Sequence, residues 1–189
     1  MNDLPLKLYM VLLGANPKGR VVEQHDYFFG IANNLKELVP AIRQSWPEAG
    51  NSIHVDGWRE VTTVDGFAIR VVEKNTSAVS NTQRLFFINL GGYQTGKLEE
   101  QHYTLLTVQD GRVPAVKESM KTAFYKTNNA RGAHSHIDEK FGVDVDDMYR
   151  IEDLLSPDLK EKYHIMITPG EGLIDDPIHL GYFKLDKII

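Results

Sequence analysis

Two short segments of the sequence place histidine beside carboxylate residues at spacings that suit metal or acid–base chemistry. The first contains Glu23, Gln24 and His25, and the second contains His54 and Asp56. Side chains two residues apart on a strand face the same side, so Glu23 with His25, and His54 with Asp56, each form a carboxylate–imidazole pair. If the two strands are neighbours, the pairs combine into two histidines and two carboxylates. Such a set suits Zn²⁺, Mn²⁺ or Fe²⁺, or a general base whose imidazole an aspartate orients.

The same residue types recur at matched places in the second half of the chain. Their counterparts, in the same order, are Glu100, Gln101, His102, His136 and Asp138. We predict that both Glu-Gln-His segments bind a ligand and that both His-x-Asp segments supply metal ligands. The alternative is structural, because a histidine at the rim of a sheet often bonds to the backbone of a neighbouring loop and a glutamate to turn N–H groups.

An internal repeat accounts for this recurrence. Residues 7–25 align with residues 84–102 at a constant offset of 77 without a gap, and seven of the nineteen pairs are identical, where chance gives about one. We therefore predict a duplicated domain. The expected organisation is a first repeat over residues 1–74, a second over residues 84–155, and a C-terminal helix and strands over residues 156–189 that complete the fold.

Hydrophobic and turn patterns predict the elements of each copy. In the first copy they indicate two strands, a helix with Asn33 or Asn34 as its cap and Pro40 in its first turn, and two further strands joined by a turn. The expected ranges are strands 7–13, 23–32, 52–62 and 67–73, a helix over 34–47 and a turn at Asp65–Gly66. Strands and helices do not alternate as in a doubly wound sheet. We predict an α+β fold of two tandem repeats related by a pseudo-twofold, with a mostly antiparallel sheet and helices packed on one face.

The loop after the first strand of the second copy resembles a phosphate-binding loop but lacks the hydroxyl residue and the helix that such a loop needs. Gly91, Gly96 and Lys97 match the pattern G-x₄-G-K, yet Leu98 stands where serine or threonine would bind Mg²⁺. Two glutamates follow, and then a strand pattern replaces the helix that would attract the anion. The sequence therefore excludes nucleotide binding of this kind. The glycines of this loop and those of its counterpart in the first copy, Gly14 and Gly19, are expected to provide turns with positive φ.

A known family shares these motifs. The apolar strand, the G-x₄-G loop with Glu-Gln-His, and the later His-Val-Asp or His-Ile-Asp, each present twice, resemble the uncharacterised bacterial family called domain of unknown function 1543. The resemblance covers most of residues 7–153. It implies a small bacterial protein built on a duplicated domain, and it implies no activity, ligand or catalytic residue.

Composition restricts the location and the partners. The net charge of −5 argues against binding to a nucleic-acid backbone, and no apolar run is long enough to span a membrane. We found no secretion signal, so we expect a cytoplasmic protein. The absence of cysteine leaves His, Asp and Glu to hold any metal, and a divalent metal ion is the cofactor that the residues suit.

These features favour a binding or assembly function over catalysis. An enzyme seldom needs two intact copies of its site, whereas a symmetric binding protein uses both. We therefore predict a non-catalytic protein that binds an unidentified small ligand or itself, without nucleic-acid or membrane partners. The alternative is a metal-assisted hydrolase that uses the paired histidine, aspartate and glutamate residues.

Overall fold

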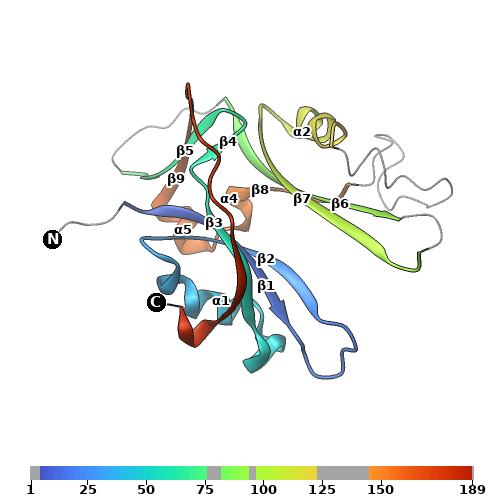
Figure 1. The fold of residues 1–189 in the computed structure, drawn as a ribbon. Helices are drawn as coiled ribbons and strands as arrows, with labels where there is room; N and C mark the ends of the chain where they lie inside the picture. The colour runs from blue at the N-terminus through green and yellow to red at the C-terminus, as the bar shows by residue number, and fades with distance from the viewer. Residues whose placement is uncertain (1–4, 76–81, 94–96, 123–144, 189) are drawn as a thin grey trace. The chain divides into compact units, whose positions relative to one another are not determined.

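The computed structural model describes residues 5–75, 82–93, 97–122 and 145–188. The chain divides into two compact units (Figure 1). Unit 1 comprises Met1–Val79 and Leu155–Ile189, and unit 2 comprises Ser80–Leu154. The C-terminal segment therefore belongs to the same unit as the first part of the chain.

The main sheet of unit 1 has the strand order β10-β3-β1-β2, and all its neighbouring strands are antiparallel. The strands are β1 (Lys7–Ala15), β2 (Gln24–Ala32), β3 (His54–Glu60) and β10 (His179–Lys184). One face of β1 is buried, through Tyr9, Val11, Leu13 and Ala15. Because alternate residues share a face, Gly14 and Leu12 lie on the opposite face.

Three short helical segments pack on the buried face instead of the single helix expected over 34–47. They are η1 (Leu35–Leu38), α1 (Val39–Ser45) and η2 (Pro47–Ser52), and their apolar side chains join β1 in one core. Asn34 caps η1 by accepting a hydrogen bond from the N–H of Glu37, as predicted. Pro40 lies in the first turn of α1. The helix ends early because Pro47 disfavours helical backbone at the residue before it, Trp46, whose φ is −135°.

A second sheet of unit 1 has the order β4-β5-β9. It is formed by β4 (Thr63–Val64), β5 (Phe67–Glu73) and β9 (Tyr163–Pro169). Asp65 and Gly66 both have positive φ, which is the geometry of a tight hairpin turn and confirms the predicted one. The short helix α5 (Pro157–Lys162) begins after Ser156, as expected, and the C-terminal η3 spans Leu185–Lys187.

A buried carboxylate attaches the segment before β10 to the end of β3. Asp176, whose side chain is 4% exposed, accepts hydrogen bonds from Arg59 (3.0 Å) and from the backbone N–H groups of Thr62 (2.9 Å) and Thr63 (3.1 Å). The hydroxyl of Thr62 also donates to it. Four hydrogen-bond donors compensate the cost of removing one charge from water. The contact therefore fixes the segment before β10 to the end of β3.

Unit 2 contains one antiparallel sheet with the order β7-β6-β8. Its elements are β6 (Arg84–Tyr93), β7 (Glu100–Gln109), α2 (Arg112–Ser119), β8 (Val145–Arg150) and α4 (Ile151–Leu154). Ala115 of α2 packs against Phe86, Ile88 and Leu90. As predicted, the loop after β6 leads into the strand β7, and a helix does not follow it.

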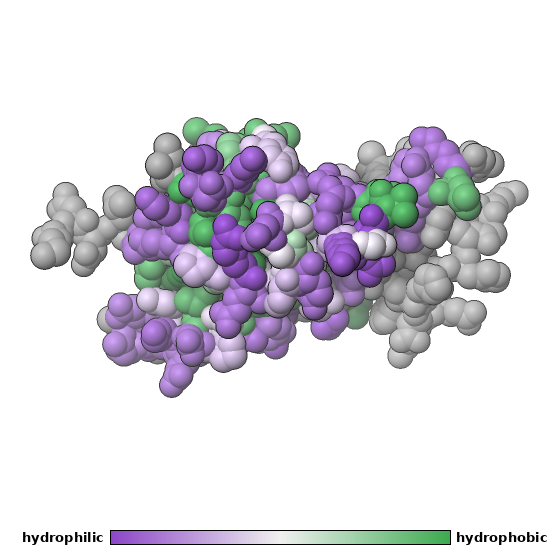
Figure 2. Space-filling model, turned by 90° about the horizontal axis from the view of Figure 1, so that it is seen from below, coloured by the Kyte–Doolittle hydropathy of each residue, from purple (hydrophilic) through white to green (hydrophobic). Residues whose placement is uncertain are grey.

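These observations confirm a mostly antiparallel fold with short helices, arranged in three sheets. Within the described ranges, none of the helices is long and apolar enough to cross a membrane. In the space-filling view of Figure 2, hydrophilic residues cover most of the described surface, with smaller hydrophobic patches between them.

Candidate functional site

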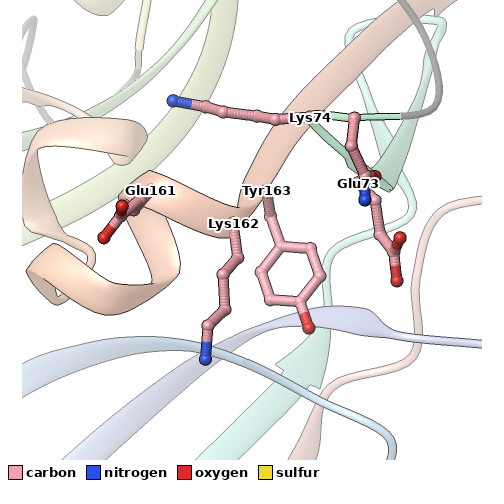
Figure 3. A pocket seen from close by; sticks show the side chains of 6 residues that line it. Glu73, Lys74, Glu161, Lys162 and Tyr163 are labelled. Carbon is pink, nitrogen blue, oxygen red and sulfur yellow. The ribbon is translucent and has the colours of Figure 1, made fainter.

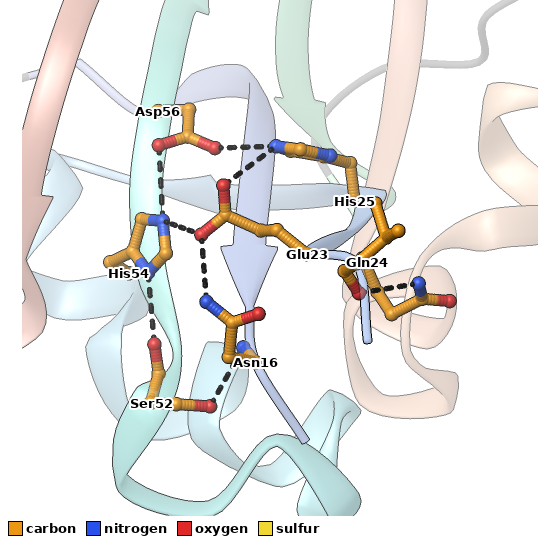
Figure 4. Close-up of polar contacts among 8 residues, drawn as sticks. Asn16, Glu23, Gln24, His25, Ser52, His54 and Asp56 are labelled. Atoms are coloured by element: carbon orange, nitrogen blue, oxygen red, sulfur yellow. Dashed lines mark hydrogen bonds and ion pairs between the residues drawn. The ribbon is translucent and has the colours of Figure 1, made fainter. Parts of the chain in front are cut away.

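Glu23, His25, His54 and Asp56 form a polar cluster in unit 1, which we call the His–carboxylate cluster (Figure 4). Glu23 lies directly before β2, His25 lies in β2, and His54 and Asp56 lie in β3. The sequence argument had required β2 and β3 to be neighbours, but β1 lies between them. Gly14 of β1 pairs with His25 on one side and with His54 on the other. The two pairs therefore meet across a glycine.

The missing side chain of Gly14 creates the space for this contact. A Cβ atom at this position would lie 2.4 Å from Nε2 of His54 and 2.4 Å from Oδ2 of Asp56. Gly14 is not among the residues with positive φ, whereas Gly19 in the following loop has a φ of 87°. The expectation that these glycines provide turns with positive φ is thus correct for Gly19 and wrong for Gly14. At position 14 the cluster requires a residue without a side chain.

A β-bulge gives Asp56 its position. Leu12 pairs with Gly57 and Leu13 pairs with Val55, so Asp56 is the extra residue of β3 at that point. Bulges of this kind change the direction of a side chain and are frequent at functional sites.

The two carboxylates each lie between the two imidazoles. Nε2 of His54 is 3.2 Å from Oδ1 of Asp56 and 3.3 Å from Oε1 of Glu23. Nε2 of His25 is 3.2 Å from Oδ2 of Asp56 and 3.7 Å from Oε2 of Glu23. The four groups therefore form a closed ring of alternating imidazole and carboxylate.

His54 is held in one orientation by the backbone. Its Nδ1 lies 2.9 Å from the carbonyl oxygen of Ser52, and because a carbonyl only accepts, Nδ1 must carry the hydrogen and donate it. In the neutral ring Nε2 then presents a lone pair to the carboxylates. Among the described residues, neither this Nε2 nor Oδ2 of Asp56 has a hydrogen-bond partner, although both are buried. The carboxylate oxygens lie at ion-pair distance but outside hydrogen-bond geometry.

Asn16 and Ser52 support the cluster, and sequence reasoning missed both. The hydroxyl of Ser52 donates to the carbonyl of Ala49 (2.6 Å) and accepts from the N–H of Asn16 (3.1 Å). The side-chain amide of Asn16 lies 3.5 Å from Oε1 of Glu23. The recurrence of Gly14 as Gly91 was the one available signal of this arrangement, and nothing in the sequence identified Asn16 or Ser52.

One side of the cluster is open to solvent. The side chain of His54 is 4% exposed, whereas those of His25 and Glu23 are 47% and 39% exposed. A ligand would therefore approach from the side of β2.

Gln24 was predicted to bind the ligand, but its side chain does not join the cluster. Its amide donates to the carbonyl of Val22 (2.9 Å), within the turn that leads into β2, and it lies apart from the imidazoles (Figure 4). The physical reason is that a residue between two neighbours on one face of a strand points to the other face.

Unit 2 contains part of the cluster that was expected to correspond to the His–carboxylate cluster. Nε2 of His102 is 3.8 Å from Oε2 of Glu100, and Nδ1 of His102 is 3.4 Å from the side-chain amide of Asn89. Gln101 is half-buried on the same strand. His136 and Asp138 lie outside the described residues, so their predicted role as metal ligands stays a prediction.

The groups of the His–carboxylate cluster do not converge on one point as metal ligands do. In the part of the chain that the structure describes, no set of three or more His, Asp or Glu side chains is arranged to hold a metal ion. Each carboxylate turns a different oxygen towards each imidazole, which explains how the groups approach one another without a common centre.

A cavity of about 280 Å³ lies elsewhere in unit 1, where β5 ends and β9 begins (Figure 3). Its lining residues are Glu73, Lys74, Asn75, Glu161, Lys162 and Tyr163. The charged side chains extend in different directions and do not converge on a ligand position. This cavity is therefore a weaker candidate than the His–carboxylate cluster.

Comparison with known proteins confirms the resemblance for the segment that carries the cluster. Residues 20–71 match the family described as Domain of Unknown Function (DUF1543). The crystal structure of a protein Il1583 from Idiomarina loihiensis is similar, with a TM-score of 0.62 and 22% identity over 95% of this chain and 98% of that chain. At this identity the similarity shows the fold alone. None of the curated proteins matches the chain.

Proposed function

We propose that this protein is a binding protein whose unit 1 binds a divalent metal ion through the His–carboxylate cluster. The observation that supports this most is the buried Nε2 of His54, which has its lone pair directed at two carboxylates and no hydrogen-bond partner among the described residues. A lone pair facing anionic oxygens is unfavourable unless a cation lies between them, which is either a metal ion or a proton bound to Nε2. Fixing Nδ1 by a backbone carbonyl is also the usual way in which proteins orient a metal-binding histidine.

The composition and spacing of the cluster fit a transition metal. Two imidazoles and two carboxylates are the ligands that Zn²⁺, Mn²⁺ and Fe²⁺ accept, and two negative charges balance one divalent ion. Ligands about 2.1 Å from a tetrahedral ion lie about 3.4 Å from one another. The imidazole–carboxylate separations of 3.2–3.7 Å are close to that value, but each carboxylate faces the two imidazoles with different oxygens. Metal binding therefore requires both carboxylates to turn, so that one oxygen of each joins both imidazoles at a common centre.

Metal content and affinity test this proposal. Untagged protein is analysed by elemental mass spectrometry and titrated calorimetrically with Zn²⁺ and Mn²⁺, and we expect one tight site in unit 1. The variant Asp56→Asn is expected to lose it. The matched control is His164→Gln, which removes a histidine of unit 1 that lies outside the cluster, on β9. Failure of the wild-type protein to bind any of Zn²⁺, Mn²⁺, Fe²⁺ or Co²⁺ contradicts the proposal.

We also propose that the two units derive from one duplicated domain. Gly14 pairs with His25 in unit 1 as Gly91 pairs with His102 in unit 2, at the offset of 77. The register shifts of β1 against β3 and of β6 against β8 lie at Leu12/Leu13 and Asn89/Leu90, again at that offset. An experimental structure in which β1–β3 cannot be superposed on β6–β8 contradicts the duplication.

This register changes the expected correspondence between the halves. Leu13 pairs with Val55, and Leu90 pairs with Val145. By this register Val145 would be the counterpart of Val55, whereas the predicted counterparts of His54 and Asp56, His136 and Asp138, lie outside the described residues.

The second candidate function is metal-assisted hydrolysis. The observation that favours it is the solvent exposure of His25 and Glu23, because a hydrolytic metal ion needs a position open to water. The test is hydrolysis of ester and phosphoester substrates by metal-loaded protein. Activity that is lost in Asp56→Asn and kept in His164→Gln supports catalysis, and absence of metal-dependent turnover leaves the binding function.

A further inference from the structure

We infer that His179 makes the docking of the C-terminal strand β10 sensitive to pH, because its protonated ring binds the indole of Trp58 more strongly than its neutral ring does. This inference goes beyond the proposed function and does not depend on a metal ion at the His–carboxylate cluster. It concerns a contact between β10 and β3, and His179 lies outside the matched segment 20–71.

The imidazole of His179 lies flat on the indole of Trp58. The two ring centroids are 4.0 Å apart, and the ring planes differ by 14°. The two residues are also directly paired in the antiparallel register of β10 and β3, so the backbone holds the rings opposite each other. A cation within about 6 Å of the centroid of an aromatic ring is attracted to its face, and indole attracts it most strongly. An imidazolium ion in this position therefore gains an attraction that a neutral imidazole lacks.

The charged groups around the stack are for the most part paired with one another. The titratable groups on the neighbouring segments are Lys7 and Tyr9 of β1, Arg59 and Glu60 of β3, and Asp175 and Asp176 before β10. Lys7 lies 2.7 Å from Glu60, and Arg59 lies 3.0 Å from Asp176. Glu60 also accepts a hydrogen bond from Tyr9. None of the carboxylates that the structure describes forms an ion pair with His179, so the indole is the partner that distinguishes its charged from its neutral form.

The stack is the main side-chain contact of the first half of β10. A register shift divides the strand between Leu180 and Phe183. Beyond the shift, Phe183 packs against the core. Before it, Ile178 and Leu180 are 63% and 75% exposed and bury little apolar surface. The attachment of this half to β3 therefore depends on His179 more than on its apolar neighbours.

β10 is expected to be held more firmly in mildly acidic than in mildly alkaline solution. Histidine changes charge between about pH 5 and pH 8. The attraction to Trp58 is present at the acidic end of this range and is lost as the pH rises through it. Because His179 is exposed, the attraction belongs to the weaker cation–π contacts. Such contacts correspond to a change of about two- to fivefold in the equilibrium between docked and open strand.

The part of the strand that responds to pH adjoins the candidate site. Tyr182 lies within the register shift, and its ring centroid is 4.3 Å from that of His54. Opening of β10 up to the shift moves this ring away from His54, whose side chain is 4% exposed in the docked state. The pH then alters access to His54 through a residue that is not part of the His–carboxylate cluster.

Amide hydrogen exchange of β10 measures this opening. The full chain is studied with a chelator present, at pH 5.5 and pH 7.8, and the rates are corrected for the intrinsic effect of pH on exchange. We expect the amides of residues 179–182 to be about two- to fivefold better protected at pH 5.5. His179→Gln is expected to remove this difference, and His179→Phe, which keeps a ring without a charge, is expected to be protected equally at both pH values. His164→Gln on β9 is the matched control and should keep the difference.

Three outcomes overturn the inference. The first is protection of the wild-type strand that is equal at the two pH values or greater at pH 7.8. The second is an unchanged difference in His179→Gln or His179→Phe, which assigns the pH dependence to another group. The third is an equal loss of the difference in His164→Gln, which shows a general effect of charge on unit 1. Because the chelator keeps the protein free of metal, these outcomes are independent of the proposed metal site.

Discussion

Gly14 lies opposite His54 in the register of β1 and β3, and its hydrogen atom occupies the place where any other residue would put a side chain between His54 and Asp56. The same glycine pairs with His25 on the other side. One residue without a side chain therefore allows two strands that do not touch each other to build a common site.

Gly14→Ala is expected to disrupt the site more than the fold. The added Cβ would lie 2.4 Å from both Nε2 of His54 and Oδ2 of Asp56, so these groups must move apart. Overpacking of this kind costs about 1–3 kcal/mol of unfolding free energy. We expect that loss in urea denaturation, together with a metal affinity reduced at least about tenfold in calorimetry.

Gly111→Ala is the control for this substitution. Gly111 has an extended backbone with a φ of −171°, and the nearest atom to an added Cβ, on Pro114, is 4.0 Å away. Metal affinity is expected to stay at the wild-type value, and the urea midpoint should fall only slightly, because Gly111 is the N-cap of α2 and alanine caps a helix less well than glycine. Unchanged metal affinity in Gly14→Ala would show that the cluster does not depend on this space.

The two histidines of the cluster are expected to respond differently to substitution. His54→Gln should lower both metal affinity and stability, by about 1–3 kcal/mol, because a buried ring that bonds to the Ser52 carbonyl is replaced. His25→Gln should lower metal affinity alone, because its side chain is half exposed. Calorimetric titration and thermal melting of both variants measure this difference.

His102→Gln provides the comparison in unit 2. Its imidazole is also half exposed and also lies near a glutamate two residues away. We expect no loss of affinity at the site in unit 1. If His25→Gln lowers the melting temperature as much as His54→Gln and leaves metal binding intact, the cluster has a structural role.

Hydrophobic and turn patterns predicted the strands of unit 1 well. The predicted strand 67–73 coincides with β5, and β10 lies in the C-terminal segment 156–189 for which strands were predicted. The helix predicted over 34–47 is present over residues 35–45, but its first turn is the 3₁₀ segment η1 and it ends before Pro47. Apolar spacing does not specify the type of the first turn or the last residue of a helix.

The site was only partly predictable for a similar reason. Residue types and spacing identified Glu23, His25, His54 and Asp56, but only the strand order shows that they meet across Gly14. Asn16 and Ser52 have no local signal, because their contacts join the loop after β1 to η2, 36 residues along the chain. Contacts between distant segments depend on register, which composition and spacing do not specify.

Asp176→Asn is expected to destabilise unit 1 strongly. The substitution removes the charge that Arg59 pairs with at 3.0 Å and weakens the bonds from the N–H groups of Thr62 and Thr63. Breaking a buried ion pair by removing one partner costs about 3–5 kcal/mol, and because Arg59 is partly exposed we expect about 3 kcal/mol. Urea denaturation of unit 1, followed by the fluorescence of Trp58, measures the loss.

Asp186→Asn serves as the matched control for Asp176→Asn. Its carboxylate lies 3.9 Å from Lys187, and both side chains are exposed. Exposed pairs contribute less than about 1 kcal/mol, so the urea midpoint should hardly change. Equal effects of the two substitutions would show that the Asp176 contacts do not fix the C-terminal segment.

The stability of unit 1 is expected to fall at alkaline pH because of Tyr9. Burial raises the pKa of the Tyr9 hydroxyl to about 12, and the negative charge of Glu60, which accepts a hydrogen bond from it at 3.2 Å, adds to the effect. In the unfolded chain the pKa is about 10. The folded state therefore keeps its proton longer, so this contribution to stability is complete below pH 10 and is lost as the pH rises towards 12.

Tyr9→Phe isolates this contribution, because it removes the ionising group and leaves the ring in the core. Between pH 9 and pH 12 the wild-type protein should lose about 2–3 kcal/mol more unfolding free energy than the variant, since one pKa unit corresponds to about 1.4 kcal/mol. Other tyrosines and the lysines titrate in both proteins and cancel in the difference. Urea denaturation at several pH values in this range gives the two curves. Parallel curves would show that the Tyr9 hydroxyl titrates alike in the folded and unfolded states, and that its burial beside Glu60 has no effect on stability at high pH.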